Sequence, residues 1–192
     1  MSLLSEQELA TLGLRAVGED VRIHPSVQFF GPEHVAIGSH VRIDCFAVIT
    51  AGPEPVTIGD HVHLGAGATL LGTGGVDVGA FTSLAARVIV FSTNDDYQSG
   101  ALNGPTVPYE YRSVLAARVS IGAHTIVGGG SVILPGVTLG RGAGVGALSL
   151  VKADVSPGQV VAGTPARPIR ERDVDRLDEL ERRLRAVEGG NA

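Results

Sequence analysis

Residues 121–156 read IGAHTIVGGGSVILPGVTLGRGAGVGALSLVKADVS and contain a branched apolar residue at every sixth position. A helix would repeat such residues about every 3.6 positions, and a half-buried strand would alternate them with polar residues, so neither explains a period of six. A parallel β-helix does, because three short strands form one triangular coil and one side chain in six points into its narrow interior. The predicted interior residues are Ile121, Val127, Ile133, Leu139, Val145 and Val151.

The same spacing extends toward the N-terminus, with short insertions at 31–34 and 51–55. It stops at Val90 and resumes at Val119, which leaves an irregular segment, 91–118, rich in polar and turn residues. A long loop inside a regular solenoid is usually functional or disordered, and we interpret this one as functional because the ladder continues on both sides. We therefore predict an all-β solenoid domain over 21–168, with further interior residues at Ile23, Phe29, Ile37, Ile43, Ile49, Ile58, Leu64, Leu70, Val78, Leu84 and Val90.

Both ends of the chain are predicted to be helical. Within 1–20, Ser5 and Glu8 have the spacing of a capping box ahead of two leucines on one helical face. Within 169–192, apolar residues three or four positions apart predict an amphipathic helix from Arg170 to Glu188. We expect its apolar stripe to cover the open end or a side of the solenoid, with contacts between subunits as the alternative. The stripe consists of Val174, Leu177, Leu180, Leu184 and Val187.

The composition excludes several classes of function. The chain has 192 residues and a net charge of −5, which gives no reason to expect a nucleic acid or an anionic membrane as partner. The single cysteine, Cys45, cannot form an internal disulfide and fits a reducing compartment. There is no apolar run of about 20 residues and no signal sequence, so we predict a cytoplasmic protein without stable membrane insertion.

The ladder, the looped-out segment and the sequence VAGTPARPIR at 161–170 together resemble the hexapeptide-repeat acyltransferases, most closely the galactoside and maltose acetyltransferase-like branch. The resemblance covers Val21 to Arg172. It implies a left-handed parallel β-helix assembled as a homotrimer, with acetyl-coenzyme A (acetyl-CoA) bound between neighbouring subunits. It also implies transfer of an acetyl group to an amino or hydroxyl group of a sugar or nucleotide sugar, for surface polysaccharide synthesis.

The resemblance further suggests which residues hold acetyl-CoA. Arg167 and Arg170 match the basic positions of the family's ending, and a guanidinium suits a phosphate because it offers fixed donors and stays charged. Lys152 stands one position earlier than the lysine that the family often has after the last interior residue. Small residues would let the thin pantetheine arm lie against the backbone, and those at the matching positions are Gly128, Gly129, Ala147 and Ser149.

In the galactoside branch, a histidine in the long loop acts as general base, and its position falls on Asp95 here. No histidine occurs between Phe91 and Arg118. An unperturbed aspartate, with a pKa of about 3.9, is a poor proton acceptor for an alcohol, whereas an amine is already partly neutral and needs only positioning and a proton sink. Asp95, assisted by Asn94, is therefore our first candidate for proton handling, which favours an amino acceptor without excluding a hydroxyl one.

Other polar residues are candidates of lower rank. Three histidines outside the loop face outward in the six-residue register and can reach a cleft between subunits, so they are reserve catalytic candidates: His61, His63 and His124. Within the loop, aromatic rings would stack on a sugar and a guanidinium would meet a nucleotide phosphate. The candidates for acceptor binding are Asp96, Tyr97, Tyr109 and Arg112.

Two alternative functions remain open at the level of sequence. A γ-class carbonic anhydrase has the same scaffold, but its zinc needs three converging histidines, and the spacing of His61, His63 and His124 does not match that cluster. We therefore predict no metal in the active site. A non-catalytic trimeric binding protein would account for the histidine-free loop. Metal analysis and coenzyme A binding distinguish these alternatives from the acetyltransferase.

Overall fold

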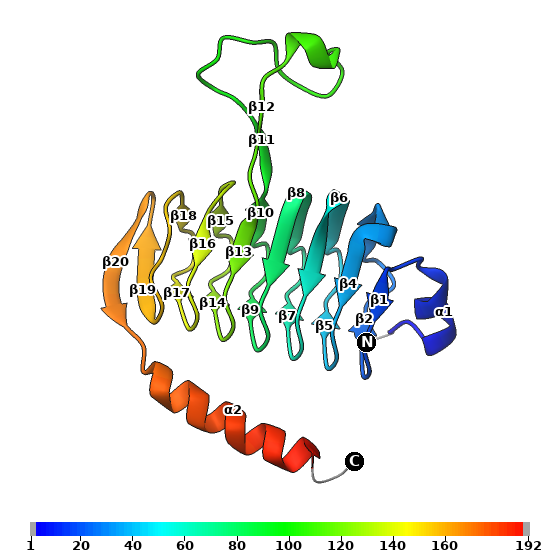
Figure 1. Cartoon of the computed structure of the whole chain (residues 1–192), viewed down its shortest axis with the longest axis vertical. Coiled ribbons are helices and arrows are strands. Elements are labelled where there is room, and N and C mark those ends of the chain that lie inside the picture. The colour runs from blue at the N-terminus through cyan, green and yellow to red at the C-terminus, as the bar shows by residue number, and fades with distance from the viewer. Residues whose placement is uncertain (1–2, 190–192) are drawn as a thin grey trace.

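The six-residue ladder folds into a left-handed parallel β-helix of about seven turns, as seen in the computed structural model, which describes residues 3–189 (Figure 1). One face of the prism is a sheet of eight strands. Seven of them are parallel, and the eighth returns antiparallel to its neighbour. In order across the sheet they are β2 (Arg22–Ile23), β5 (Arg42–Ile43), β7 (His63–Leu64), β9 (Ser83–Leu84), β14 (Ile126–Val127), β17 (Gly144–Val145), β19 (Gln159–Gly163) and β20 (Ala166–Glu171).

The other two faces belong to a ten-stranded sheet, in which the long strands β6 and β8 pass around a corner and contribute to both faces. A separate two-stranded hairpin, β11 (Thr93–Asp95) with β12 (Val114–Ala116), is antiparallel. The strands of the large sheet are β1 (Ala16–Val17), β3 (Gln28–Phe30), β4 (Val35–Ile37), β6 (Val48–Ile58), β8 (Thr69–Val78), β10 (Ile89–Phe91), β13 (Val119–Ile121), β15 (Val132–Ile133), β16 (Thr138–Leu139) and β18 (Leu150–Val151).

The predicted interior residues form the core. All six between Ile121 and Val151 are at most 4% exposed, and the earlier members of the ladder are equally buried except Phe29, which is partly buried. Small hydroxyl side chains lie beside them and donate to backbone carbonyls at the corners, as from Thr125 to Gly122 (2.6 Å). Each fully buried aliphatic side chain contributes about 1.5–3 kcal/mol, so stability accumulates along the solenoid.

The corners explain the glycines and several unusual backbone angles. A Cβ on Gly122 would lie 2.6 Å from the backbone nitrogen of Arg141 in the next coil, so that position has no room for a side chain. At another corner, non-glycine residues adopt the left-handed conformation with φ between 55° and 59°, which usually favours glycine. These stacked corner residues are His40, His61, Phe81 and His124.

A helix lies near each end of the chain. Helix α1 (Glu6–Thr11) begins with the predicted capping box between Ser5 and Glu8, and two single-turn 3₁₀ helices, η1 (Pro32–His34) and η2 (Tyr109–Tyr111), lie in loops. Helix α2 (Val174–Gly189) begins later than predicted. Arg170 is in strand β20, because residues 166–171 pair with β19 before the helix starts. No helix within residues 3–189 has both the length and the apolar character needed to cross a bilayer.

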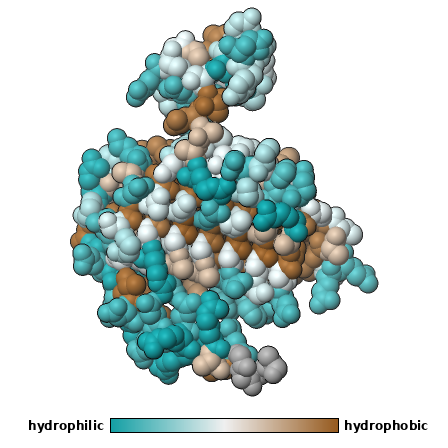
Figure 2. Space-filling view, in the orientation of Figure 1, coloured by the Kyte–Doolittle hydropathy of each residue, from teal (hydrophilic) through white to brown (hydrophobic). Residues whose placement is uncertain are grey.

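Helix α2 lies along a side of the solenoid rather than over its open end (Figure 1). The prediction that its apolar stripe covers the solenoid is wrong for Leu180, Leu184 and Val187, which are exposed because charged side chains make the contact there. Contacts of the stripe between subunits stay a prediction. Val174 packs over Gly142 and Gly158 near the last coil, and Glu188 reaches back to His61. Figure 2 shows a hydrophobic band that crosses the solenoid between the largely hydrophilic hairpin tip and the hydrophilic α2.

Candidate active site

The segment 91–118 leaves the solenoid at one corner as the β11–β12 hairpin, on the side opposite α2 (Figure 1). Its base is fixed by Ser92, which is fully buried and whose hydroxyl donates to the Leu71 carbonyl (2.8 Å). At the other end of the loop, Arg118 pairs with Glu54 (2.7 Å) and Asp77 (2.9 Å), and these hydrogen bonds raise the pKa of the Arg118 guanidinium. The loop is therefore an anchored arm.

Asp95 lies at the end of β11 and is held by the distal part of the same loop. One carboxylate oxygen accepts the backbone N–H of Gly104 (3.1 Å), and the other is 3.7 Å from an Arg112 guanidinium nitrogen. Asp96 accepts from the Gln98 backbone N–H (2.9 Å) and is used for local loop structure. The backbone and Arg112 therefore fix the orientation of the Asp95 carboxylate before any substrate arrives.

A groove of about 510 Å³ brings the loop carboxylates together with the last coils of the solenoid. It is lined by 94–98 of the loop, and by Leu134, Pro135 and Lys152 of the coils. A second hollow of about 200 Å³ continues from Lys152 to Arg167. Lys152 belongs to both, so its early position in the sequence does not turn it away from the loop. Asp95 and Arg167 thus lie in two hollows that share Lys152 as a lining residue.

The remaining predicted cofactor residues lie in different surroundings. The Ser149 hydroxyl points inside the prism, where it donates to the Gly146 carbonyl (2.7 Å) and accepts from the Gly163 N–H (3.0 Å), so it is not available to a ligand on the surface. Gly128 is required by coil stacking, because a Cβ there would be 2.4 Å from the backbone nitrogen of Ala147. Ala147 is exposed, Gly129 is half-buried, and Arg170 is exposed on β20 outside both hollows.

The three reserve histidines have partners away from the loop. His61 pairs with Glu188 (3.3 Å) and His124 hydrogen-bonds to Glu181, both on α2. His124 was expected to face outward, and it does leave the prism, but α2 covers it and its side chain is 7% exposed. His63 is on the eight-stranded face and hydrogen-bonds to Asp44 (2.9 Å).

His63 is the more accessible of the three, with 42% of its side chain exposed. Burial raises the pKa of its partner Asp44, but hydrogen bonds from His63 and Arg42 outweigh burial, so the pKa of that carboxyl lies below its ordinary value. Asp44 therefore stays ionised and orients the imidazole.

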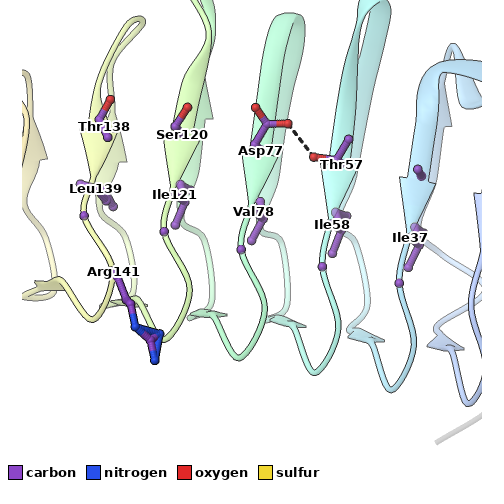
Figure 3. Close-up of a pocket in the computed structure, with 16 residues that line it drawn as sticks. Ile37, Thr57, Ile58, Asp77, Val78, Ser120, Ile121, Thr138, Leu139 and Arg141 are labelled. Carbon is purple, nitrogen blue, oxygen red and sulfur yellow. Dashed lines mark hydrogen bonds between the residues drawn. The ribbon is translucent and has the colours of Figure 1, made fainter. Parts of the chain in front are cut away.

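Sequence reasoning missed a shallow strip of about 640 Å³ along strands β4, β6, β8, β13 and β16. Figure 3 shows the short outward side chains of the strands, the longer Arg141 at its edge, and the hydrogen bond from Thr57 to Asp77 (2.6 Å). The signal was present, because the residue before each interior residue on this face is small or short: Ala36, Thr57, Asp77, Ser120 and Thr138.

Comparison with known proteins identifies the family. A model described as the hexapeptide repeat of succinyl-transferase matches residues 55–90 and 118–147. A dTDP-4-amino-4,6-dideoxy-D-glucose acyltransferase from Escherichia coli is 39% identical over 181 residues, which is 94% of each chain. The chain belongs to the hexapeptide-repeat acyltransferases.

Solved structures agree with this assignment. The N-acyltransferase AntD from Bacillus cereus, in complex with dTDP and 3-hydroxybutyryl-CoA, is 34% identical and superposes with a TM-score of 0.91 over 100% of this chain and 99% of its own. A hexapeptide-repeat acetyltransferase from Vibrio cholerae, 23% identical with a TM-score of 0.59 over 90% of this chain and 84% of its own, shares the fold. The similarity to named acyltransferases confirms the acyltransferase prediction and disfavours the two alternatives, a carbonic anhydrase and a non-catalytic binding protein.

Proposed function

We propose that this acyltransferase moves an acetyl group from acetyl-CoA to the amino group of a nucleotide-linked amino sugar. The observation that carries the proposal is the groove in which Asn94, Asp95 and Lys152 meet, in a loop without histidine. Two relatives support an amino acceptor: the E. coli protein is named for a dTDP-4-amino sugar, and AntD has been solved with that sugar and coenzyme A. AntD has also been solved with one aspartate substituted.

The chemistry suits a carboxylate. The neutral amine attacks the thioester carbonyl carbon, so a C–N bond forms and the carbonyl π electrons move to oxygen. The nitrogen then loses a proton, the C–S bond breaks, and coenzyme A leaves as a thiolate that takes up a proton. Asp95 would hold the amine in line and accept its proton, with Asn94 as a neutral hydrogen-bonding neighbour. A carboxylate fixed by Gly104 and Arg112 performs this role without reorganising.

Charged residues would orient the two substrates. Lys152 and Arg167 line the hollow next to the Asp95 groove and would bind coenzyme A phosphates. Arg170 stays a candidate from its exposed place on β20. Arg112 would meet the acceptor's diphosphate, because a guanidinium offers several fixed donors to phosphate oxygens. Tyr97 and Tyr109 at the loop tip are 87% and 77% exposed and would stack on a sugar or a base.

A hydroxyl acceptor is the second candidate, and His63 favours it. An imidazole oriented by an ionised carboxylate is the usual arrangement for activating a hydroxyl group, and His63 with Asp44 has that arrangement. His63 lies on a different face from the loop, so it would act only on an acceptor bound between subunits. We propose a homotrimer with active sites between subunits and a cytoplasmic role in surface polysaccharide synthesis, on the strength of the family resemblance.

The test is coenzyme A release, followed with a thiol reagent, for matched acceptors. The pair is dTDP-4-amino-4,6-dideoxyglucose and its 4-hydroxyl counterpart, each with acetyl-CoA and with 3-hydroxybutyryl-CoA. We expect turnover with the amine and acetyl-CoA, and an amide product by mass spectrometry. Turnover only on the hydroxyl compound, abolished in His63→Ala, would replace the amino-acceptor proposal with the second candidate. Turnover only with the longer donor would refute the acetyl assignment.

A further inference from the structure

A column of flat rings runs along the corner beneath α2. His40, His61, Phe81 and His124 stack in successive coils, with ring centroids 4.7, 4.5 and 5.0 Å apart. Helix α2 meets this column through charged side chains rather than through its apolar stripe. Leu180, Leu184 and Val187 of the stripe are exposed instead. Two groups of histidine and carboxylate side chains result at this contact, outside the candidate active site.

The first group already has its counter-ion. His124, Asp178 and Glu181 place their ligand atoms within 4.8 Å of one another. Arg141 contacts both carboxylates, and Arg185 lies 2.8 Å from Glu181. These guanidinium groups neutralise the acidic residues, so a metal ion at this position would have to displace a cation that the protein itself supplies.

The second group has no such cation. The ligand atoms of His40, His61 and Glu188 lie within 4.8 Å of one another. Within residues 3–189, no lysine or arginine is within ion-pair distance of Glu188, and its partner is His61 at 3.3 Å. That separation is what two ligands of a tetrahedral ion require, since metal–nitrogen bonds of about 2.0–2.1 Å place neighbouring ligand atoms about 3.3 Å apart.

A carboxylate behind one of the histidines adds to the resemblance to a metal site. The Nδ1 atom of His40 is 3.4 Å from an Asp20 carboxylate oxygen, which leaves its Nε2 free as a ligand. Histidine ligands commonly donate their other ring nitrogen to a carboxylate in this way. The rings of His40 and His61 are 16° from parallel, so they must tilt toward each other at their Nε2 edges to bind one ion. His40, 42% exposed, has room to do so.

We propose that His40, His61 and Glu188 bind a divalent transition-metal ion of the zinc type. Two imidazoles and one carboxylate are a ligand set that zinc, nickel and copper accept, with water completing the coordination. The ion fastens the C-terminal turns of α2 to the second and third coils, far from the Asp95 groove. The site is independent of the acyl-transfer proposal, because none of its ligands lies in the loop or in either hollow beside Lys152.

The experiment is titration of the purified full chain with zinc alone, by calorimetry, with hydrogen exchange of α2 measured in parallel. The variants are His40→Asn, His61→Asn and Glu188→Gln. Asparagine is chosen because both histidines have a left-handed backbone, which asparagine tolerates better than alanine. The matched control is His34→Asn, which removes a histidine beside a different glutamate, Glu33.

We expect one zinc per chain, at least tenfold weaker binding in each of the three variants, unchanged binding in His34→Asn, and slower exchange near Glu188 when zinc is bound. Tetrahedral bands on cobalt substitution give a second readout, and they disappear in Glu188→Gln. Failure of the unmodified chain to bind zinc at millimolar concentration overturns the proposal. Binding that survives all three substitutions also overturns it, because the ion is then held elsewhere.

Discussion

Asp95→Asn tests the catalytic proposal with the smallest structural change. Asparagine has the same shape as aspartate and keeps a carbonyl oxygen for the Gly104 N–H, which now lies 3.1 Å from the carboxylate. What it loses is the charge and the ability to accept a proton. The contact with Arg112 is 3.7 Å long, which is beyond hydrogen-bond distance, so its loss should not unfold the loop.

The expected loss is large in activity and small in stability. Removing a general base lowers turnover by a factor of about 100 to 10,000, which corresponds to about 3–5 kcal/mol of transition-state stabilisation. Weakening one hydrogen bond to a backbone N–H costs about 0.5–1.5 kcal/mol of unfolding free energy. Asp95→Ala removes the acceptor for Gly104 as well, so it should lose at least as much turnover while keeping the solenoid.

The assay is coenzyme A release with the dTDP amino sugar at saturating donor, so that kcat and KM are obtained separately. Asp173→Asn is the control, since that carboxylate also accepts a backbone N–H, from Arg176 (2.9 Å), but lies outside the loop and outside both hollows beside Lys152. We expect kcat to fall in Asp95→Asn and to stay within a few-fold in Asp173→Asn. A kcat/KM within threefold of the unmodified enzyme in Asp95→Asn would refute the reasoning.

Three further outcomes follow from the structure. Leu84→Ala, at a fully buried interior position, should lower the free energy of unfolding by about 2–5 kcal/mol in urea titrations; a loss below 1 kcal/mol would contradict the rigid core. Arg118→Met should cost only about 0.2–1 kcal/mol per lost ion pair, yet raise the acceptor KM and the rate of proteolysis within 91–118; unchanged proteolysis would mean that the arm is anchored elsewhere. Burial raises the pKa of Glu181, but hydrogen bonds from His124 and Arg185 outweigh it, so the pKa lies below its ordinary 4.5. That contribution is present above pH 4.5 and is lost as the pH falls through the lowered value, so hydrogen exchange of α2 should accelerate there, and Glu181→Gln should abolish this acid step.

The solenoid was predictable from sequence because its geometry repeats. An inward position in one coil fixes the inward position six residues later, so Ile121 and Leu139 could be placed without any long-range information. The start of α2 could not be placed in this way. The sequence around Arg170 is compatible with a helix, but the free edge of β19 offers backbone partners, and pairing with that edge is decided by tertiary contact.

The candidate site was predictable in part, for a related reason. The six-residue register correctly indicated that the His124 side chain leaves the prism. It could not indicate that α2 covers this part of the outer surface. The register likewise could not show that the Ser149 hydroxyl bonds to a backbone carbonyl inside the prism and is therefore not a surface contact for a ligand. Asp95 and Lys152 are 57 positions apart in the sequence and line one groove only because the hairpin leaves the solenoid beside coils that come later in the chain. Local patterns carry no record of that placement.

The strand pairing of the solenoid continues across the insertion 91–118, and this has a consequence for how such enzymes diversify. Strand β8 pairs with β10 before the arm and with β13 after it, so the coil is already complete without residues 91–118. The entropy of closing a flexible insertion grows only with the logarithm of its length, at about 0.6 kcal/mol for each doubling. The arm can therefore lengthen, shorten or exchange its tip at little thermodynamic cost, and new acceptor preferences can arise there while the coils that would bind the donor stay unchanged.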